Sequence, residues 1–367
     1  MEIFPQISSM KRLHRKFERI QRDPQLTAKA IGLRYVSGTA PGLARLRRGK
    51  GFGYVTADGT PCRDKITLRR IQRMVLPPAW ETVWICADET GHLQATGIDA
   101  KGRKQYRYHE DWNQIRNQTK YYRLTRFAEA LPAIRVRLEE DLRVPGLPYH
   151  KVLALAVKVI ELTCIRVGNE AYKKLYGSVG LTTLQDDHVD INGSKVQFQF
   201  RGKKGVHQNI NLKSRRLANL LAKCRDIPGD ELFQYYDEQG KHRPIGSGDV
   251  NGYLKDVTGA DFTAKDFRTW AGTVAAFRAF QELGPFSTPT EMKRNVVRAY
   301  DLVAERLGNT RTVCKKYYVH PAVVTAYETG KLETYFEGLP ESEEDTPGFE
   351  LSPLENAVKR LIEESAA

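Results

Sequence analysis

The chain has 367 residues, with 58 Lys and Arg against 44 Asp and Glu, a formal net charge of +14 and a hydrophobic fraction of 41%. That hydrophobic fraction is spread along the chain and supports buried cores, which excludes a mostly disordered polymer. No stretch approaches the roughly 20 uncharged apolar residues that a bilayer needs, which excludes a membrane-spanning protein, and the length suggests two domains.

The charge is unevenly distributed along the chain. Residues 337–367 hold nine acidic and two basic side chains, a net charge of −7, which leaves +21 for the rest of the chain. A basic body attracts a polyanion, and nucleic acid is the usual one. From charge alone, a solvated basic surface that only keeps the protein soluble stays open as the alternative.

The N-terminal part predicts a small β-rich domain. A basic lead with weak helical periodicity covers residues 1–27, and its charges leave no room for the apolar core of a secretory signal. In residues 28–110, short alternating segments are punctuated by Gly, Pro and Asp-Gly, a pattern typical of strands joined by tight turns. The expected strands are RYVSG (34–38), GFGYVTADGT (51–60), TVWICAD (82–88), LQATGID (93–99) and RKQYRYH (103–109).

Residues 111–338 predict a larger, mainly helical domain. An apolar helix is expected over 150–163, and alternation through 178–212, with turns at Asn192-Gly193 and Gly202–Gly205, predicts a three-stranded antiparallel sheet. The fold class is therefore α+β, with a small N-terminal β-rich domain, a larger helical domain and one small sheet.

Helices are expected to dominate from Leu217 to about Leu332. Thr263 and Thr290 are the expected N-caps of two of them. The acidic C-terminal tail, residues 339–367, is expected to be weakly ordered, although Pro353–Ile362 has an amphipathic pattern.

The sequence lacks the common enzyme motifs. It contains no P-loop, no GxGxxG that opens a helix, no HExxH and no GxSxG, and its eight His lack ligand spacing. The five cysteines are far apart with no CxxC pair, which disfavours a disulfide scaffold and structural zinc. No cofactor, nucleotide or metal is therefore expected. Four strings rich in cations and tyrosines remain: CIRVGNEAY (164–172), FRGKKG (200–205), KDFRTW (265–270) and LGNTRTVCKKYY (307–318).

In this order and at these intervals, the four strings resemble the active-site segments of type IB DNA topoisomerases, in the short form found in bacteria and poxviruses. The resemblance runs from about Ile31 to Gly338, and KGRKQYRYH (101–109) is similar to the family's DNA-contacting strand. It implies a monomer that clamps double-stranded DNA between two lobes and relaxes supercoils by cutting and resealing one strand, without ATP or metal. It further implies a 3′-phosphotyrosyl intermediate and a cytoplasmic, nucleoid-associated enzyme.

The resemblance also assigns roles residue by residue. The nucleophile is Tyr318, the paired arginines are Arg166 and Arg268, and the turn lysine is Lys203. The family's fifth position is usually His, and Asn309 stands there in this chain. The implied DNA contacts are Gln105, Tyr106, Tyr108 and Tyr172.

The residue types suit this chemistry independently of the resemblance. Two guanidinium groups offset charge on nonbridging phosphate oxygens through bidentate hydrogen bonds. A phenol with an ordinary pKa of about 10 is only about 0.1% ionised at pH 7, so cations near Tyr318 favour its nucleophilic form. The departing sugar hydroxyl needs a proton, and Lys203 on a hairpin turn has a mobile, reachable side chain. Asn309 can donate a hydrogen bond as His does, but without charge.

Taken singly, several features have simpler explanations. A lone Arg166 suits a surface ion pair, GKKG (202–205) suits a basic turn, and Tyr106 and Tyr108 suit the cap of a sheet. A register shift of one residue would make Tyr317 the nucleophile instead of Tyr318. Phe267 and Trp270 are expected to pack in the core and so hold Arg268 in place.

Two other functions stay open for the whole chain. A tyrosine recombinase shares the catalytic logic, but typically carries HxxR where this chain has KDFR (265–268). A non-catalytic DNA-binding protein on a decayed scaffold is the second alternative. The full set of catalytic positions argues against it.

Overall fold

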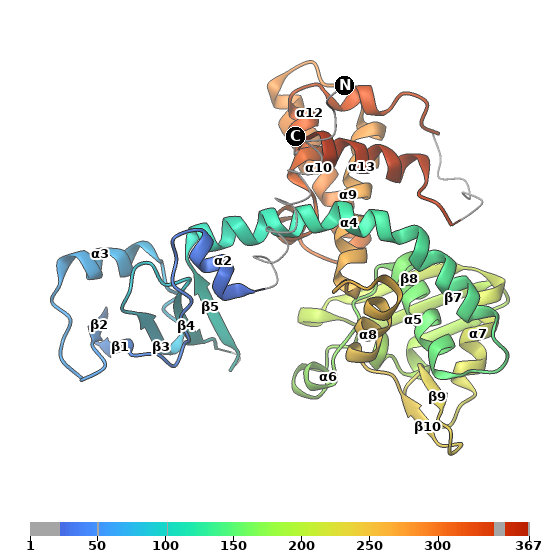
Figure 1. Cartoon of the computed structure of the whole chain (residues 1–367), viewed down its shortest axis with the longest axis horizontal. Coiled ribbons are helices and arrows are strands. Elements are labelled where there is room, and N and C mark those ends of the chain that lie inside the picture. The colour runs from blue at the N-terminus through green and yellow to red at the C-terminus, as the bar shows by residue number, and fades with distance from the viewer. Residues whose placement is uncertain (1–22, 50, 101, 341–348, 366–367) are drawn as a thin grey trace, which may run out of the picture. The chain divides into compact units, whose positions relative to one another are not determined.

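The computed structural model describes residues 23–49, 51–100, 102–340 and 349–365 (Figure 1). Residues 1–22, most of the predicted basic lead, therefore lie outside the described part. The chain divides into two compact units, Met1–Tyr121 and Tyr122–Ala367, and the boundary falls within the long helix α4 (Glu110–Arg143). Among the described residues, no helix has the length and apolar character needed to cross a membrane.

The first unit is built on a five-stranded antiparallel sheet. In spatial order its strands are β2 (Gly51–Val55), β1 (Gly42–Arg48), β3 (Glu81–Cys86), β4 (Leu93–Ile98) and β5 (Lys104–Tyr108). Among the residues described, helices α2 (Pro24–Ala30) and α3 (Lys65–Arg73) and the first part of α4 belong to the same unit. Helix α3 begins after Asp64, whose carboxylate accepts hydrogen bonds from the backbone N–H groups of Ile66 and Thr67. Strand β5 lies at an edge of the sheet.

Some expectations for the first unit are wrong. The segment 34–38 is not a strand, because Arg34 forms only an isolated bridge with Gly91. Side-chain contacts hold this segment instead: the ring of Tyr35 stacks on His92 with centroids 4.2 Å apart, and the Val36 N–H donates to Nδ1 of His92 at 3.0 Å. Strand β1 and helix α3 are absent from the predicted elements. Each is rich in arginine and has one buried residue, Leu43 in β1 and Ile71 in α3, so neither contains a continuous apolar run.

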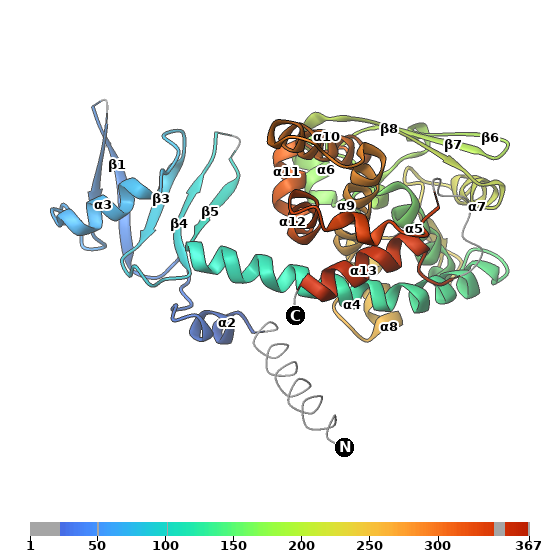
Figure 2. The same ribbon diagram turned by 90° about the horizontal axis from the view of Figure 1, so that it is seen from above.

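The second unit holds most of the helices and a three-stranded antiparallel sheet. The order β6 (Val189–Asn192), β7 (Lys195–Arg201), β8 (His207–Lys213) confirms the sheet expected over residues 178–212. Helix α7 (Arg215–Arg225) packs against it (Figure 2). The other helices are α5 (Tyr149–Thr163), α6 (Glu170–Tyr176), α8 (Ser247–Thr258), α9 (Ala264–Leu283), α10 (Pro289–Leu307), α11 (Arg311–Tyr317), α12 (Pro321–Glu328) and α13 (Pro353–Ser365). In the described part of this unit, 3₁₀ turns cover Leu181–Thr183, Asp186–His188, Lys203–Gly205 and Leu332–Tyr335.

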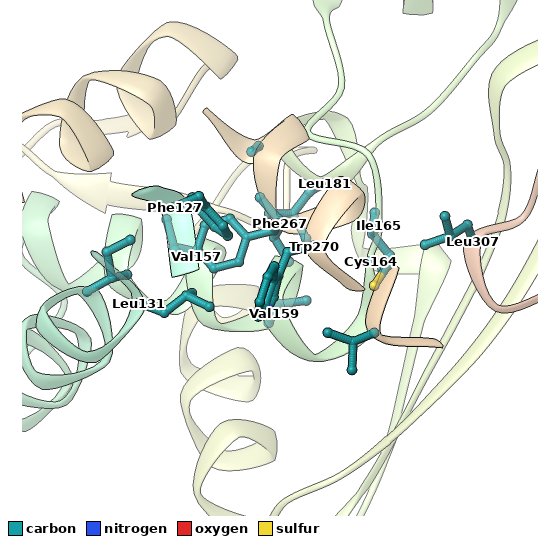
Figure 3. Close-up of a cluster of buried hydrophobic side chains, with 14 of the residues drawn as sticks. Phe127, Leu131, Val157, Val159, Cys164, Ile165, Leu181, Phe267, Trp270 and Leu307 are labelled. Carbon is teal, nitrogen blue, oxygen red and sulfur yellow. The ribbon is translucent and has the colours of Figure 1, made fainter. Parts of the chain in front are cut away.

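Helix α5 lies at the centre of the apolar core, as its run of apolar residues predicts. Every residue from Val152 to Val157 is buried. Figure 3 shows Phe267 and Trp270 of α9 in a cluster with Phe127 of α4 and Val157 of α5. The expectation that Phe267 and Trp270 pack in the core is therefore confirmed, and the same packing fixes the part of α9 between them.

Two local expectations for the second unit are wrong and one is confirmed. Thr263 caps α9, with its N–H donating to Asp266 Oδ2 at 2.8 Å. Helix α10 is capped by Thr288, whose hydroxyl accepts from the Glu291 N–H, and Thr290 lies inside the helix because Pro289 already occupies its first position. A hairpin of β9 (Gln234–Tyr236) and β10 (His242–Pro244) interrupts the stretch expected to be helical.

The expectation of a weakly ordered C-terminal tail is also wrong for the described residues 349–365. Helix α13 buries Leu354, Val358, Leu361 and Ile362 and packs against α9 and α12. The acidic composition of the tail led to the wrong expectation because the acidic residues of α13 lie on its solvent side. The exception is Glu355, which is buried and paired with Arg135.

Candidate active site

Arg268 is a buried cation with no carboxylate partner in the described part of the chain. Only 4% of this residue is exposed. Its guanidinium donates to the backbone carbonyls of Cys164 and, at 2.8 Å, of Leu307. Figure 3 shows Cys164 and Leu307 on the same side of the core cluster. Two carbonyls orient the guanidinium without neutralising it, so its charge remains available for an anion.

Arg166 follows the end of α5 and approaches the same place. The C-cap of α5 is Cys164, which has a left-handed backbone (φ 56°). This is a strained conformation that a non-glycine residue keeps only where the surroundings enforce it. Arg166 donates to the carbonyl of Gly308 at 3.2 Å and to the side-chain oxygen of Asn309. Burial, and then the charge of Arg268, lower the pKa of Arg166 to about 10.

Tyr318 lies directly after α11, with its ring beside Arg268. The guanidinium carbon is 5.2 Å from the ring centroid. Burial raises the pKa of the phenol, but the charge and hydrogen bond of Arg268 and the charges of Arg166 and Lys265 outweigh it and hold the pKa below 10.0. In contrast, the Tyr317 ring lies 5.3 Å from Lys316, and 39% of the residue is exposed.

Asn309 completes this group from the end of α10. Gly308 ends that helix in a left-handed conformation (φ 55°), which turns Asn309 toward Arg166. Because Arg166 donates to the amide oxygen of Asn309, the amide nitrogen faces away from Arg166. That nitrogen and Nε of Arg268 are buried and lack hydrogen-bond partners among the described residues. Two buried donors without acceptors suit a bound anion.

Lys203 is the assigned residue that the structure does not join to the others. It is exposed and opens the 3₁₀ turn between β7 and β8. The turn is closed by the Gly202 N–H, which donates to the Val206 carbonyl at 2.8 Å, and by the Gly205 N–H, which donates to Gly202 at 3.0 Å. Within the described part, no hydrogen bond or ion pair links Lys203 to Arg166 or Tyr318.

The sequence analysis assigned no role to three residues near Tyr318, although one of them, Lys265, stands in the KDFRTW string. Gly272 lies one turn after Arg268, and a Cβ there would be 2.7 Å from the Tyr318 carbonyl oxygen. The Thr273 hydroxyl donates to that same carbonyl at 3.3 Å. Lys265 lies one turn before Arg268 and adds a third positive charge near the phenol. A glycine inside a helical pattern and cations three residues apart were the available signals.

The expected DNA contacts of the first unit lie on its edge strand. The rings of Tyr106 and Tyr108 are stacked with centroids 6.1 Å apart, and 50% and 37% of these residues are exposed. Gln105 is half-buried, and its amide donates to Asp99 at 2.8 Å. The side chain of Tyr172, on α6, lies outside the described part.

The chain matches known proteins over most of its length. Residues 109–344 match a family model for the catalytic core of eukaryotic DNA topoisomerase I, and residues 51–99 match one for the N-terminal domain of bacterial DNA topoisomerase IB. DNA topoisomerase 1B of Acanthamoeba polyphaga mimivirus is 30% identical over 294 residues, which are 78% of this chain and 88% of the relative. DNA topoisomerase 1B of Vaccinia virus (strain Copenhagen) is 25% identical over 250 residues, 67% of this chain and 75% of the relative.

A solved structure of the XerH site-specific recombinase bound to palindromic difH substrate matches more weakly. The TM-score is 0.33, with 16% identity over 51% of this chain and 47% of that chain. A likeness at this level does not discriminate between folds.

Proposed function

The chain belongs to the type IB DNA topoisomerases, and we propose that Tyr318 is the nucleophile with which it cuts and reseals one strand of duplex DNA. The observation that carries this assignment is the convergence of Arg166, Arg268 and Asn309 beside the Tyr318 ring. In this arrangement two buried donors, Arg268 Nε and Asn309 Nδ2, have no acceptor in the described part of the chain. The nonbridging oxygens of a phosphate supply such acceptors.

The proposed reaction exchanges one ester for another. The Tyr318 oxygen gives its proton to solvent and attacks the scissile phosphorus. A bond forms between this oxygen and the 3′-phosphate, and the bond from phosphorus to the 5′ oxygen breaks. Arg166, Arg268 and Asn309 donate to the nonbridging oxygens, where negative charge increases in the transition state. Lys203 gives a proton to the departing 5′ oxygen.

Resealing is the reverse of cleavage, with the 5′ hydroxyl as nucleophile and the phenol as leaving group. Because a phosphodiester and a phosphotyrosyl ester are the same type of bond, no nucleotide is consumed. Between the two steps the free strand swivels and supercoils are released. The arginines offset the phosphate charge in this scheme, so it requires neither ATP nor metal.

The first unit has a proposed role in holding the duplex. Tyr106 and Tyr108 form an exposed stack on the edge strand β5, with Lys104 Nζ 5.9 Å from the Tyr106 ring. Aromatic rings next to cations are typical of surfaces that contact nucleic acid. We expect the enzyme to act as a monomer that closes on DNA, in the cytoplasm with the nucleoid.

Relaxation of a supercoiled plasmid, in EDTA and without ATP, tests the proposal. The expected result is relaxation by the parent protein and none by Tyr318→Phe, which removes one oxygen and no charge and should keep the duplex affinity. Activity that survives in Tyr318→Phe and is lost in Tyr317→Phe would contradict the assignment of Tyr318. Duplex binding without relaxation by the parent protein would support the non-catalytic alternative, and recombined products would support the recombinase.

A further inference from the structure

Gln208 lies between the Lys203 turn and the Asn309 end of the active site. It is the second residue of β8 and pairs with Phe200 of β7, so the Lys203 turn begins and ends within a few residues of it. Its side chain is half-buried and contacts two glycines. A Cβ on Gly202 would lie 3.2 Å from Gln208 Cγ, and a Cβ on Gly308 would lie 2.8 Å from Gln208 Nε2.

Each of these glycines precedes a residue of the active site. Gly202 precedes Lys203 and is the N-cap of the turn that carries it. Gly308 precedes Asn309, and its carbonyl accepts the hydrogen bond from Arg166. The Gln208 side chain therefore lies between the turn that carries Lys203 and the end of α10 that carries Asn309.

The contact depends on the absence of side chains at both glycines. The amide of Gln208 has room against Gly308 because that residue has no Cβ, and the nearest amide atoms would overlap any larger side chain. Its one hydrogen bond among the described residues is a long one, from Nε2 to the His207 carbonyl at 3.4 Å. The amide therefore packs against Gly308 in addition to making this long hydrogen bond.

We propose that Gln208 is a positioning residue that holds the Lys203 turn in place for proton transfer to the departing 5′ oxygen. The proposal rests on the function assigned above to Lys203 and Tyr318. A general acid acts only within hydrogen-bond reach of its target, and Lys203 is exposed on a short turn closed by two backbone hydrogen bonds. A packed side chain between the turn and Gly308 limits how far the turn can move from the phosphate.

The test compares two DNA substrates in single-turnover cleavage at a mapped site. One is ordinary duplex DNA, and in the other sulfur replaces the 5′ bridging oxygen of the scissile phosphate. A thiolate leaves readily without a proton, so loss of the general acid matters on the first substrate and little on the second. Lys203→Ala is the reference variant, expected to be slowed by about 10² to 10⁴ on ordinary DNA.

Gln208→Ala is expected to be slowed by about 10-fold to 10² on ordinary DNA and to recover to within about threefold of the parent on the sulfur substrate. The double variant with Lys203→Ala should be little slower than Lys203→Ala alone, because both changes affect one proton transfer. Gln208→Met restores side-chain volume and should recover most of the rate on ordinary DNA. Asn209→Ala, the next residue of β8, removes the hydrogen bond from Gln197 and should cleave both substrates as the parent does.

Equal slowing of Gln208→Ala on both substrates would overturn the proposal, since the residue would then act through the arginines, Asn309 or the fold. An unchanged rate on ordinary DNA would overturn it as well. Thermal unfolding of each variant identifies a folding defect, and in that case Gln208→Met carries the test. If only this inference is wrong, the parent protein still cleaves DNA and Tyr318→Phe does not. If the proposed function is wrong, the parent protein itself does not cleave DNA.

Discussion

At Tyr318, burial and charge act on the phenol in opposite directions. Burial raises its pKa, and the charges of Arg268, Arg166 and Lys265 together lower it further than burial raises it. Removing a cation therefore raises the pKa and reduces the ionised fraction at neutral pH. Lys265 is the informative cation to remove, because it is exposed and its side chain joins no hydrogen bond or ion pair within the residues described.

Lys265→Met is expected to shift the pH dependence of cleavage toward higher pH. The rate should fall most at neutral pH, where little phenol is ionised, and should approach the parent rate at alkaline pH. Single-turnover cleavage at saturating enzyme, from about pH 6 to about pH 10, measures this shift. Lys331→Met, another exposed lysine of the second unit, is the control and should leave the profile unchanged. A loss of equal size at every pH would show that Lys265 acts on DNA binding or the phosphate, not on the phenol.

The hydrogen bond from Arg166 fixes which end of the Asn309 amide faces the site. The oxygen accepts from Arg166, so the nitrogen donates to the phosphate in the proposed mechanism. Asn309→Ala should slow cleavage by about 10² to 10³, the scale for removal of one such donor. Asn309→His should retain or raise activity.

The pH profile gives an independent check on Asn309. An amide has no proton to lose near neutral pH, so the parent should show no titration near pH 6.5 from this position, and Asn309→His should introduce one. If Asn309→Ala cleaves as fast as the parent, the position is structural and the two arginines alone stabilise the phosphate.

Among the elements, α13 is bonded through Glu355 to α4 and to α9, the helix that carries Arg268. Glu355 of α13 pairs with Arg135 of α4 at 2.8 Å. It also accepts a hydrogen bond at 3.0 Å from Nε1 of Trp270, which lies two residues after Arg268 on α9. Arg135 also pairs with Glu161 of α5 at 2.8 Å. Burial raises the pKa of Glu355, but hydrogen bonds and charge from Arg135, and the bonds from Trp270 and Ser352, hold it below 4.5.

Glu355→Gln should lower the free energy of unfolding by about 2 kcal/mol at neutral pH, because Arg135 loses one of two charged hydrogen-bond partners. The pKa of Glu355 is lower in the folded state, so its contribution is present above about pH 4.5 and is lost as the pH falls through the folded value. The difference between parent and variant should therefore shrink in acid. Urea unfolding at neutral and acid pH measures it.

Glu363→Gln is the matched control on the same helix. Its carboxylate lies 3.6 Å from Lys359 at the surface, so the stability change should stay within about 0.5 kcal/mol. A neutral effect of Glu355→Gln at neutral pH would mean that α13 is held by its apolar face alone.

At the scale of the whole molecule, the distribution of charge governs encounter with DNA. Residues 1–336 carry a net +21, and the acidic residues follow them. A protein that closes on a duplex neutralises several phosphates, and each adds about −0.9 to the slope of log affinity against log salt.

Duplex affinity should therefore fall steeply with salt. We expect at least about five phosphate contacts, hence a slope of about −4.5 or steeper. Equilibrium binding of Tyr318→Phe to a duplex measures it without covalent trapping. A slope near zero would indicate that the positive charge only keeps the protein soluble, and would contradict the prediction that the protein closes around DNA.

The sequence by itself determined the elements that depend on local pattern: helix α5, the three-stranded sheet, the cap at Thr263 and the four strings that carry the site. Periodicity, turn residues and motif spacing are properties of neighbouring residues, so they need no folded context. The proposed roles of Tyr318, Arg166, Lys203, Arg268 and Asn309 came from the resemblance of those strings to the active-site segments of type IB DNA topoisomerases.

Tertiary structure alone decided how the side chains of Tyr318, Arg166, Arg268 and Asn309 meet. Arg268 is oriented by carbonyls of Cys164 and Leu307, 104 and 39 residues away. Helix α13 packs its apolar face on α9 and α12, and its Glu355 pairs with Arg135, which lies 220 residues earlier in the chain. The acidic composition of the tail shows neither contact. Contacts of this kind follow from the packing of distant segments, and no local pattern records them, because burial changes both the charge balance and the partners that each side chain can reach.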